Sequence, residues 1–188
     1  MSSPKRLKPT PSGPPAPAPL PLELKNPHPR DKRIVFYDEI MWQGRMHYHR
    51  YWIDGETDKV KSVTAFTHYG FRPFDADAQI QKMMTTSVLN PESEYYQMTA
   101  EQIRKEWAAA GPAGTYMHRQ IELYENGLMC DYSSKEMEMF FNFKRDYKHL
   151  TIWRTELNLF CKDLWVAGQA DAVYINAEGE YEIYDWKR

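Results

Sequence analysis

The fold is decided by residues 151–188, which read TIWRTELNLFC-KD-LWVAGQADAVYI-NAEGE-YEIYDW-KR. Three apolar runs rich in β-branched and aromatic residues follow one another in this stretch. The breaks between them hold charged residues, asparagine and glycine, which are typical of turns. The stretch therefore predicts a three-stranded meander, with strands at Thr151–Cys161, Leu164–Ile175 and Tyr181–Trp186.

Each predicted strand carries an acidic residue inside its run: Glu156 in the first strand, Asp171 in the second and Asp185 in the third. Strand interiors disfavour aspartate, and a buried carboxylate needs a compensating partner. Because side chains alternate along a strand, Asp185 and Lys187 share one face. Three acids with a lysine beside them indicate a functional site.

The acids on the second and third strands suit a hard metal ion. Two carboxylates that converge from neighbouring strands form an oxygen-rich pocket, which favours Mg²⁺ or Mn²⁺ over Zn²⁺. The small residues Gly168 and Ala170 leave room beside Asp171. A lysine on the same face can hold a phosphate oxygen or orient a water molecule.

These residues resemble the motifs of a known family. Gly168-x-x-Asp171 and Asp185-Trp186-Lys187 are similar to the second and third motifs of the PD-(D/E)xK nucleases. Upstream, Gly114-Thr115-x-x-His118-x-x-Ile121-Glu122 resembles the first motif of the RecB-like exonuclease branch. Ser62-Val63-Thr64, with Phe71-x-x-Phe74-Asp75 after it, resembles the segment that precedes this motif in some members. The resemblance therefore extends from about residue 61 to residue 188.

The resemblance implies a ligand set for Mg²⁺ or Mn²⁺. Asp171, Asp185 and the backbone carbonyl of Trp186 would hold the metal ion. His118 would add a ligand, with Glu122 supporting it from one helical turn away on the same face.

The resemblance also implies a reaction. Lys187 would orient the attacking water or neutralise developing charge, and Glu156 would reach a second metal ion or a metal-associated water. We therefore expect a metal-dependent nuclease that hydrolyses phosphodiester bonds in DNA. The family favours exonucleases that act on DNA ends or single strands in repair, recombination or replication.

The expected fold is mixed α/β: a restriction-endonuclease-like core in which helices flank a mixed central sheet, preceded by a β-hairpin and a helical segment. The hairpin strands are predicted at Arg33–Trp42 and Arg45–Ile53. Apolar periodicity and capping residues predict four helices. They span Asp75–Leu89, Thr99 to a break at Gly111–Gly114, Thr115–Glu125, and Ser134–His149. In the first helix, Ile80, Met83 and Met84 are predicted to be buried. In the last helix, Tyr147 is predicted to lie in the core, and the solvated face is predicted to carry Lys135, Lys144, Arg145 and Lys148.

One departure from the family lies at the C-terminus. In the family, a helix with a Gln-x-x-x-Tyr motif and a further strand follow the Asp-x-Lys strand. Here the sequence stops one residue after Lys187. We expect either that residues 31–188 are an incomplete nuclease-like domain of a longer protein, or that a further chain completes the sheet.

Residues 1–30 have a different composition, rich in proline and poor in aromatic residues, which predicts an extended, disordered basic arm. Lys5-Arg6-Leu7-Lys8 resembles a short nuclear-import signal, although a solvated basic tail explains it equally well. The sequence has only two cysteines, and it has neither an apolar run of membrane-spanning length nor a signal-peptide pattern. These features indicate a reducing, intracellular location.

The charge distribution opens an alternative function. Beyond Arg33 the chain carries 17 basic and 24 acidic residues, so the folded part has a net charge near −7. This charge disfavours a protein that grips nucleic acid by bulk attraction. A catalytically silent, nuclease-like module that binds DNA or protein is therefore the second hypothesis. A third takes Glu156 and Asp171 as a glycosidase acid/base pair, which leaves Lys187 and His118 unexplained.

Overall fold

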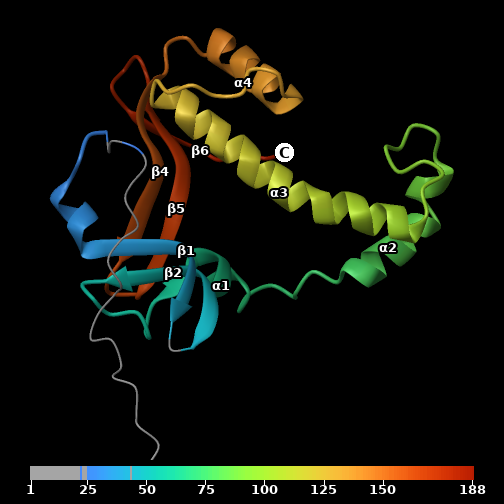
Figure 1. Cartoon of the computed structure of the whole chain (residues 1–188), viewed down its shortest axis with the longest axis horizontal. Helices are drawn as coiled ribbons and strands as arrows, with labels where there is room; N and C mark the ends of the chain where they lie inside the picture. The colour runs from blue at the N-terminus through green and yellow to red at the C-terminus, as the bar shows by residue number, and fades with distance from the viewer. Residues whose placement is uncertain (1–21, 23–24, 43) are drawn as a thin grey trace, which may run out of the picture. The chain divides into compact units, whose positions relative to one another are not determined.

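A computed structural model describes residue 22 and residues 25–42 and 44–188 (Figure 1). The chain forms two compact units. The first contains the described residues up to Gly70 together with Glu156–Ala170, and the second contains Phe71–Thr155 with Asp171–Arg188. The two long strands β4 (Thr151–Cys161) and β5 (Val166–Ile175) contribute residues to both units.

The first unit is built on the predicted hairpin. Strand β1 (Ile34–Trp42) pairs antiparallel with β2 (Arg45–Ile53), from Ile34 opposite Ile53 to Trp42 opposite Arg45. Gly44 supplies the turn with a φ of 75°, a backbone conformation that glycine adopts without steric cost. The unit also contains the 3-10 turn η1 (Pro29–Arg33), the short strand β3 (Lys61–Ser62) and helix α1 (Val63–Thr67).

The core of the first unit joins this hairpin to the start of β5. Ile34, Tyr51 and Ile53 pack around Ala167, which is almost fully buried. Strand β3 pairs parallel with β5, placing Ser62 opposite Ala167. Gly168 follows directly, and a Cβ there would lie 2.8 Å from Cγ2 of Val63. Gly168 is therefore explained by the close approach of Val63, whereas the sequence suggested that it leaves room beside Asp171.

The second unit contains helices on both ends of one long helix, α3 (Ala100–Glu125; Figure 1). Its first part packs Ile103 against α2 (Ala76–Met84) and the 3-10 turn η2 (Ser87–Leu89). Its last part packs Met117 and Ile121 against α4 (Lys135–Asp146). Two separate apolar clusters thus hold the two ends of α3.

The predicted helix break at Gly111–Gly114 is wrong, because α3 runs straight through this segment with Pro112 inside it. A proline inside a helix removes one backbone hydrogen bond and clashes with the preceding turn, at a cost of about 3 kcal/mol that packing of the flanking turns can offset. Here both flanking halves are packed, and the Thr115 hydroxyl donates to the carbonyl oxygen of Gly111 at 3.3 Å.

Two other helix predictions needed shortening. The segment predicted as one helix from Asp75 to Leu89 is α2 followed by η2, and Met84 is 37% exposed although it was predicted to be buried. The prediction for Ser134–His149 holds in part, since α4 ends at Asp146. Tyr147, predicted to lie in the core, follows it and is exposed.

The C-terminal meander is confirmed, with shifted ends. Strand β4 has the predicted bounds, β5 begins two residues later than predicted, and β6 (Tyr181–Tyr184) ends two residues earlier. Strand β6 pairs antiparallel with β5, from Ala172 opposite Tyr184 to Ile175 opposite Tyr181. The structure is therefore mixed α/β, as predicted, with one two-stranded and one four-stranded sheet among the described residues.

An aromatic cluster packs the end of this meander against α4. Phe143 lies at its centre, with ring-centroid distances of 5.9 Å to Tyr174 and 5.2 Å to both Tyr184 and Trp186. Phe140 meets Trp186 edge to face at 5.6 Å. Pairs of this geometry contribute beyond simple area burial. They fix the backbone of the C-terminal segment next to α4.

Most of the predicted N-terminal arm lies outside the described residues, and so does the segment Lys5-Arg6-Leu7-Lys8. Arg30, the last residue of the predicted arm, donates from Nη2 to the carbonyl oxygen of Phe160 at 2.8 Å. None of the helices in the described part of the chain combines the length and apolarity that a membrane span requires.

Candidate functional site

Three of the predicted ligands converge in the second unit, each from a different element. His118 on α3 places Nε2 3.1 Å from the carbonyl oxygen of Trp186 and Nδ1 3.6 Å from Oδ2 of Asp171 on β5. The backbone N–H of Trp186 donates to the same Asp171 oxygen at 2.7 Å. One imidazole, one carboxylate and one backbone carbonyl group therefore lie next to one another.

The local sequence explains why each group is held there. His118 lies between the buried core residues Met117 and Ile121 on α3, so the packed stripe of this helix orients it. On β5, Asp171 precedes Ala172, which is fully buried in a core cluster with Leu150 and Tyr174. The Trp186 ring is fixed by the aromatic cluster, and this positions its backbone carbonyl. The side chains of His118 and Asp171 are 29% and 14% exposed, which leaves them open to a small ligand.

Asp185 and Lys187 flank Trp186 in the sequence and form an ion pair, with Nζ 2.7 Å from Oδ2. Both lie beyond the end of β6, so the prediction that a strand places them is wrong, although they do share a side. The hydrogen bond to Asp185, with the nearby charge of Asp171, raises the pKa of Lys187 above its ordinary value. Lys187 is therefore a cation at neutral pH, suited to stabilising negative charge rather than to accepting a proton.

The two remaining predicted residues are both glutamates. Glu122, one turn beyond His118, accepts a hydrogen bond from Arg119 Nη1 at 2.7 Å. Glu156 belongs to the first unit, on β4, where its carbonyl oxygen accepts from Gln169 Nε2 at 3.3 Å. Its backbone adopts a φ of 47°, which is uncommon for a residue with a side chain. The catalytic roles of both glutamates stay predictions.

Sequence reasoning missed a buried polar network behind the site. Glu125, at the end of α3, accepts from the Tyr174 hydroxyl at 2.5 Å and pairs with Lys144 Nζ at 2.9 Å. Burial, followed by the Glu125 charge, raises the pKa of Tyr174. Lys144 was predicted to lie on a solvated face, but its side chain is only 21% exposed. The network connects α3, α4 and β5, two of which carry His118 and Asp171.

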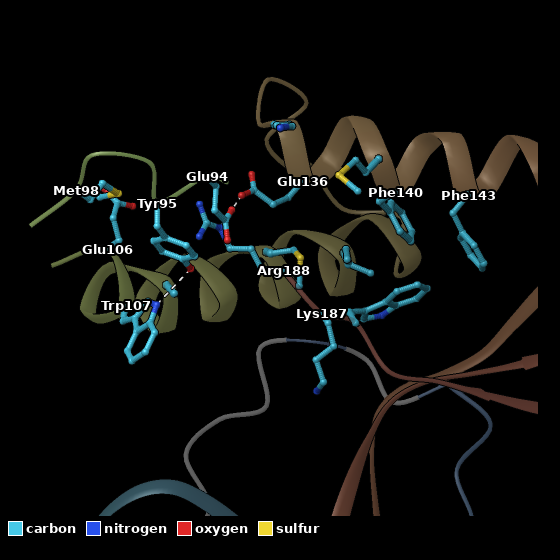
Figure 2. Close-up of a pocket in the computed structure, with 16 residues that line it drawn as sticks. Glu94, Tyr95, Met98, Glu106, Trp107, Glu136, Phe140, Phe143, Lys187 and Arg188 are labelled. Atoms are coloured by element: carbon cyan, nitrogen blue, oxygen red, sulfur yellow. Dashed lines mark hydrogen bonds and ion pairs between the residues drawn. The ribbon is translucent and has the colours of Figure 1, made fainter. Parts of the chain in front are cut away.

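A pocket of about 840 Å³ adjoins Trp186 and Lys187 (Figure 2). Its walls come from the middle of α3, from α4 and from the loop that contains Tyr95. Trp107 donates from Nε1 to the Tyr95 hydroxyl at 3.3 Å on one side, and Arg188 pairs with Glu136 at 2.7 Å on another. Lys187 therefore borders open space on one side and Asp185 on the other.

Comparison with protein-family models, with curated proteins and with solved structures found no match to this chain.

Proposed function

We propose that the protein is a metal-dependent nuclease, with a restriction-endonuclease-like core, that hydrolyses phosphodiester bonds in DNA. The observation that carries this proposal is the convergence of His118, Asp171 and the Trp186 carbonyl, with the Asp185–Lys187 pair beside them. In this proposal the substrate is a DNA end or a single strand, and the enzyme acts in DNA repair, recombination or replication.

The donor chemistry fits a hard divalent cation. Carboxylate and carbonyl oxygens suit Mg²⁺ and Mn²⁺, and one imidazole is compatible with either ion. Asp171, Asp185, the Trp186 carbonyl and His118 would hold the ion, which when bound supplies a Lewis acid for a phosphodiester oxygen. The imidazole lies against the carbonyl and the carboxylate, so contacts within the protein hold these three groups next to one another.

Lys187 supplies positive charge where negative charge develops. Its raised pKa keeps it protonated, and its side chain is 78% exposed, so it can reach a phosphate oxygen. Glu122 is proposed to support His118, and Glu156 to assist at a second metal ion or at a water molecule. The role of Glu122 rests on the first motif, and the role of Glu156 rests on its position in the first predicted strand of the meander.

The metal site is tested by Mn²⁺ titration, with the melting temperature as the readout. Binding at 100 times Kd stabilises a fold by about 2.7 kcal/mol, which gives a measurable shift. We expect the Asp171→Asn/Asp185→Asn double variant to lose this shift. A Glu101→Gln/Glu138→Gln variant removes the same charge from exposed positions of the same unit and should keep it. An unchanged metal response in the aspartate variant would refute the site.

The reaction is tested separately by Mg²⁺-dependent cleavage of end-labelled single- and double-stranded DNA. We expect cleavage by the wild type and none by Asp171→Asn. Equal cleavage by both proteins would remove Asp171 from the reaction.

One observation favours a second candidate, a nuclease-like binding module without turnover. The Trp186 N–H donates to Asp171 and the Trp186 carbonyl oxygen lies within hydrogen-bonding distance of His118, so contacts within the protein already occupy part of the proposed ligand set. A protein that binds DNA but neither responds to Mn²⁺ nor cleaves with Mg²⁺ would establish this candidate.

A further inference from the structure

The first unit carries a continuous band of cations on two aromatic rings. Arg30 and Arg33 both lie over the Phe160 ring, with guanidinium carbons 4.6 and 5.3 Å from its centroid. Lys59 and Lys162 both lie near the Trp165 ring, with Nζ atoms 5.3 and 5.9 Å from its centroid. We call the residues Arg30, Arg33, Lys59 and Lys162 the cationic band.

A single carboxylate joins the two halves of this band. Arg33 binds Asp54 through Nε and Nη2, both at 2.8 Å, and Lys162 binds the same carboxylate. These partners hold the pKa of Asp54 well below its ordinary value, so it stays ionised. One carboxylate among four cations leaves the band with a net charge of about +3 at neutral pH.

The band contrasts with the rest of the folded chain. Residues 25–70 and 156–170 carry nine lysines and arginines against eight acids, whereas residues 71–155 and 171–188 carry twelve against seventeen. Over these residues the net charge is +1 in the first unit and −5 in the second, so most of the acidic excess lies in the second unit. In the first unit, the four cations are all on exposed residues, and their positions are fixed by ring and carboxylate contacts.

We propose that the cationic band binds the phosphate backbone of a DNA strand; this inference rests on the proposed function. Guanidinium groups bind phosphate oxygens through paired donors, and lysines add point charges. Ring stacking restricts the side chains, which lowers the entropy cost of forming these contacts. Backbone binding of this kind is independent of sequence and strongly dependent on salt.

The test is fluorescence anisotropy of a labelled single-stranded oligonucleotide, measured in EDTA so that the metal site does not contribute. The variant is Arg30→Gln/Lys59→Gln, which leaves the Arg33–Asp54–Lys162 pairs intact. Each lost phosphate contact on a single strand lowers affinity about fivefold at 0.1 M salt, because the salt slope is about 0.7 per contact. We expect Kd to rise about 25-fold and the salt slope to fall by about 1.4.

The matched control is Lys82→Gln/Lys105→Gln, which removes the same charge from exposed positions of the second unit. Its Kd should stay within about twofold of the wild type. Lys59→Gln alone should lower DNA affinity about fivefold, and it replaces the double variant in the assay if the double variant melts at a lower temperature than the wild type. The inference would be overturned if the band and control variants lost DNA affinity equally, or if neither lost affinity. It would also be overturned if the wild type bound polyglutamate but not DNA.

Cleavage assays separate this inference from the proposed function. Band-dependent DNA binding without Mg²⁺-dependent cleavage would refute the nuclease and leave the band as a DNA surface. Mg²⁺-dependent cleavage with equal DNA binding by the band and control variants would keep the nuclease and overturn the band.

Discussion

Replacing Lys144 by methionine should destabilise the second unit, because it removes one partner of a buried ion pair. Lys144 Nζ lies 2.9 Å from Glu125, whose side chain is only 4% exposed. Methionine keeps the length, the apolar stem and the helix propensity of lysine in the last turn of α4. The change therefore isolates the charge.

The expected cost is about 3 kcal/mol. At 2.9 Å and an effective dielectric constant of about 20, the attraction between the charges is about 6 kcal/mol, and the cost of desolvating them offsets part of it. Removing one partner of a buried pair typically costs about 3–5 kcal/mol. We take the lower end because the Tyr174 hydroxyl still donates to Glu125 at 2.5 Å.

Urea unfolding at pH 7 measures this cost, with Lys148→Met as the exposed control and an expected effect within about 0.5 kcal/mol. A Glu125→Gln background should reduce the cost of Lys144→Met substantially, because the carboxylate that needs the cation is gone. A cost below about 1 kcal/mol for Lys144→Met, or the same cost in both backgrounds, would refute the buried-pair explanation.

Two further predictions concern the first unit. Gly168→Ala should lower the free energy of unfolding in urea by about 1–2 kcal/mol, because the added Cβ would lie 2.8 Å from Val63. A Val63→Ala background should remove most of that cost. Equal costs in both backgrounds would exclude this clash. Asp54 has a lowered pKa in the folded state, so the stability it contributes is present above its unfolded pKa of about 4 and is lost as the pH falls further. Asp54→Asn should therefore flatten the decline of melting temperature between about pH 5 and pH 2. An equally steep decline would show that Arg33 and Lys162 do not act through this carboxylate.

The sequence predicted local features well where short-range signals decide them. The meander followed from β-branched and aromatic runs, and Thr99 begins α3 with the capping box that the sequence indicated. It failed where distant residues decide the outcome. Gly111–Gly114 has the composition of a break, but apolar clusters at both ends of α3 keep the helix continuous.

The candidate site shows the same division. The alternation rule placed Asp185 and Lys187 on one side, and they do pair, although the strand ends before them. The contact of His118 with Trp186 joins residues 68 positions apart, and only the family motifs suggested it. The Glu125–Lys144 pair had no sequence signal, because a lysine in the last turn of an amphipathic helix is usually solvated.

The most direct test of the nuclease proposal is single-turnover cleavage of end-labelled DNA in Mg²⁺ by the wild type, by Lys187→Ala and by the control Lys148→Ala. DNA binding by the same three proteins is measured in Ca²⁺. A cation that acts on developing charge contributes mainly in the transition state. Lys187→Ala should lower the cleavage rate by about 10²–10³ and leave Kd nearly unchanged. No cleavage by a wild type that binds DNA, or a Lys187→Ala variant that loses binding and keeps its rate, would contradict the proposal.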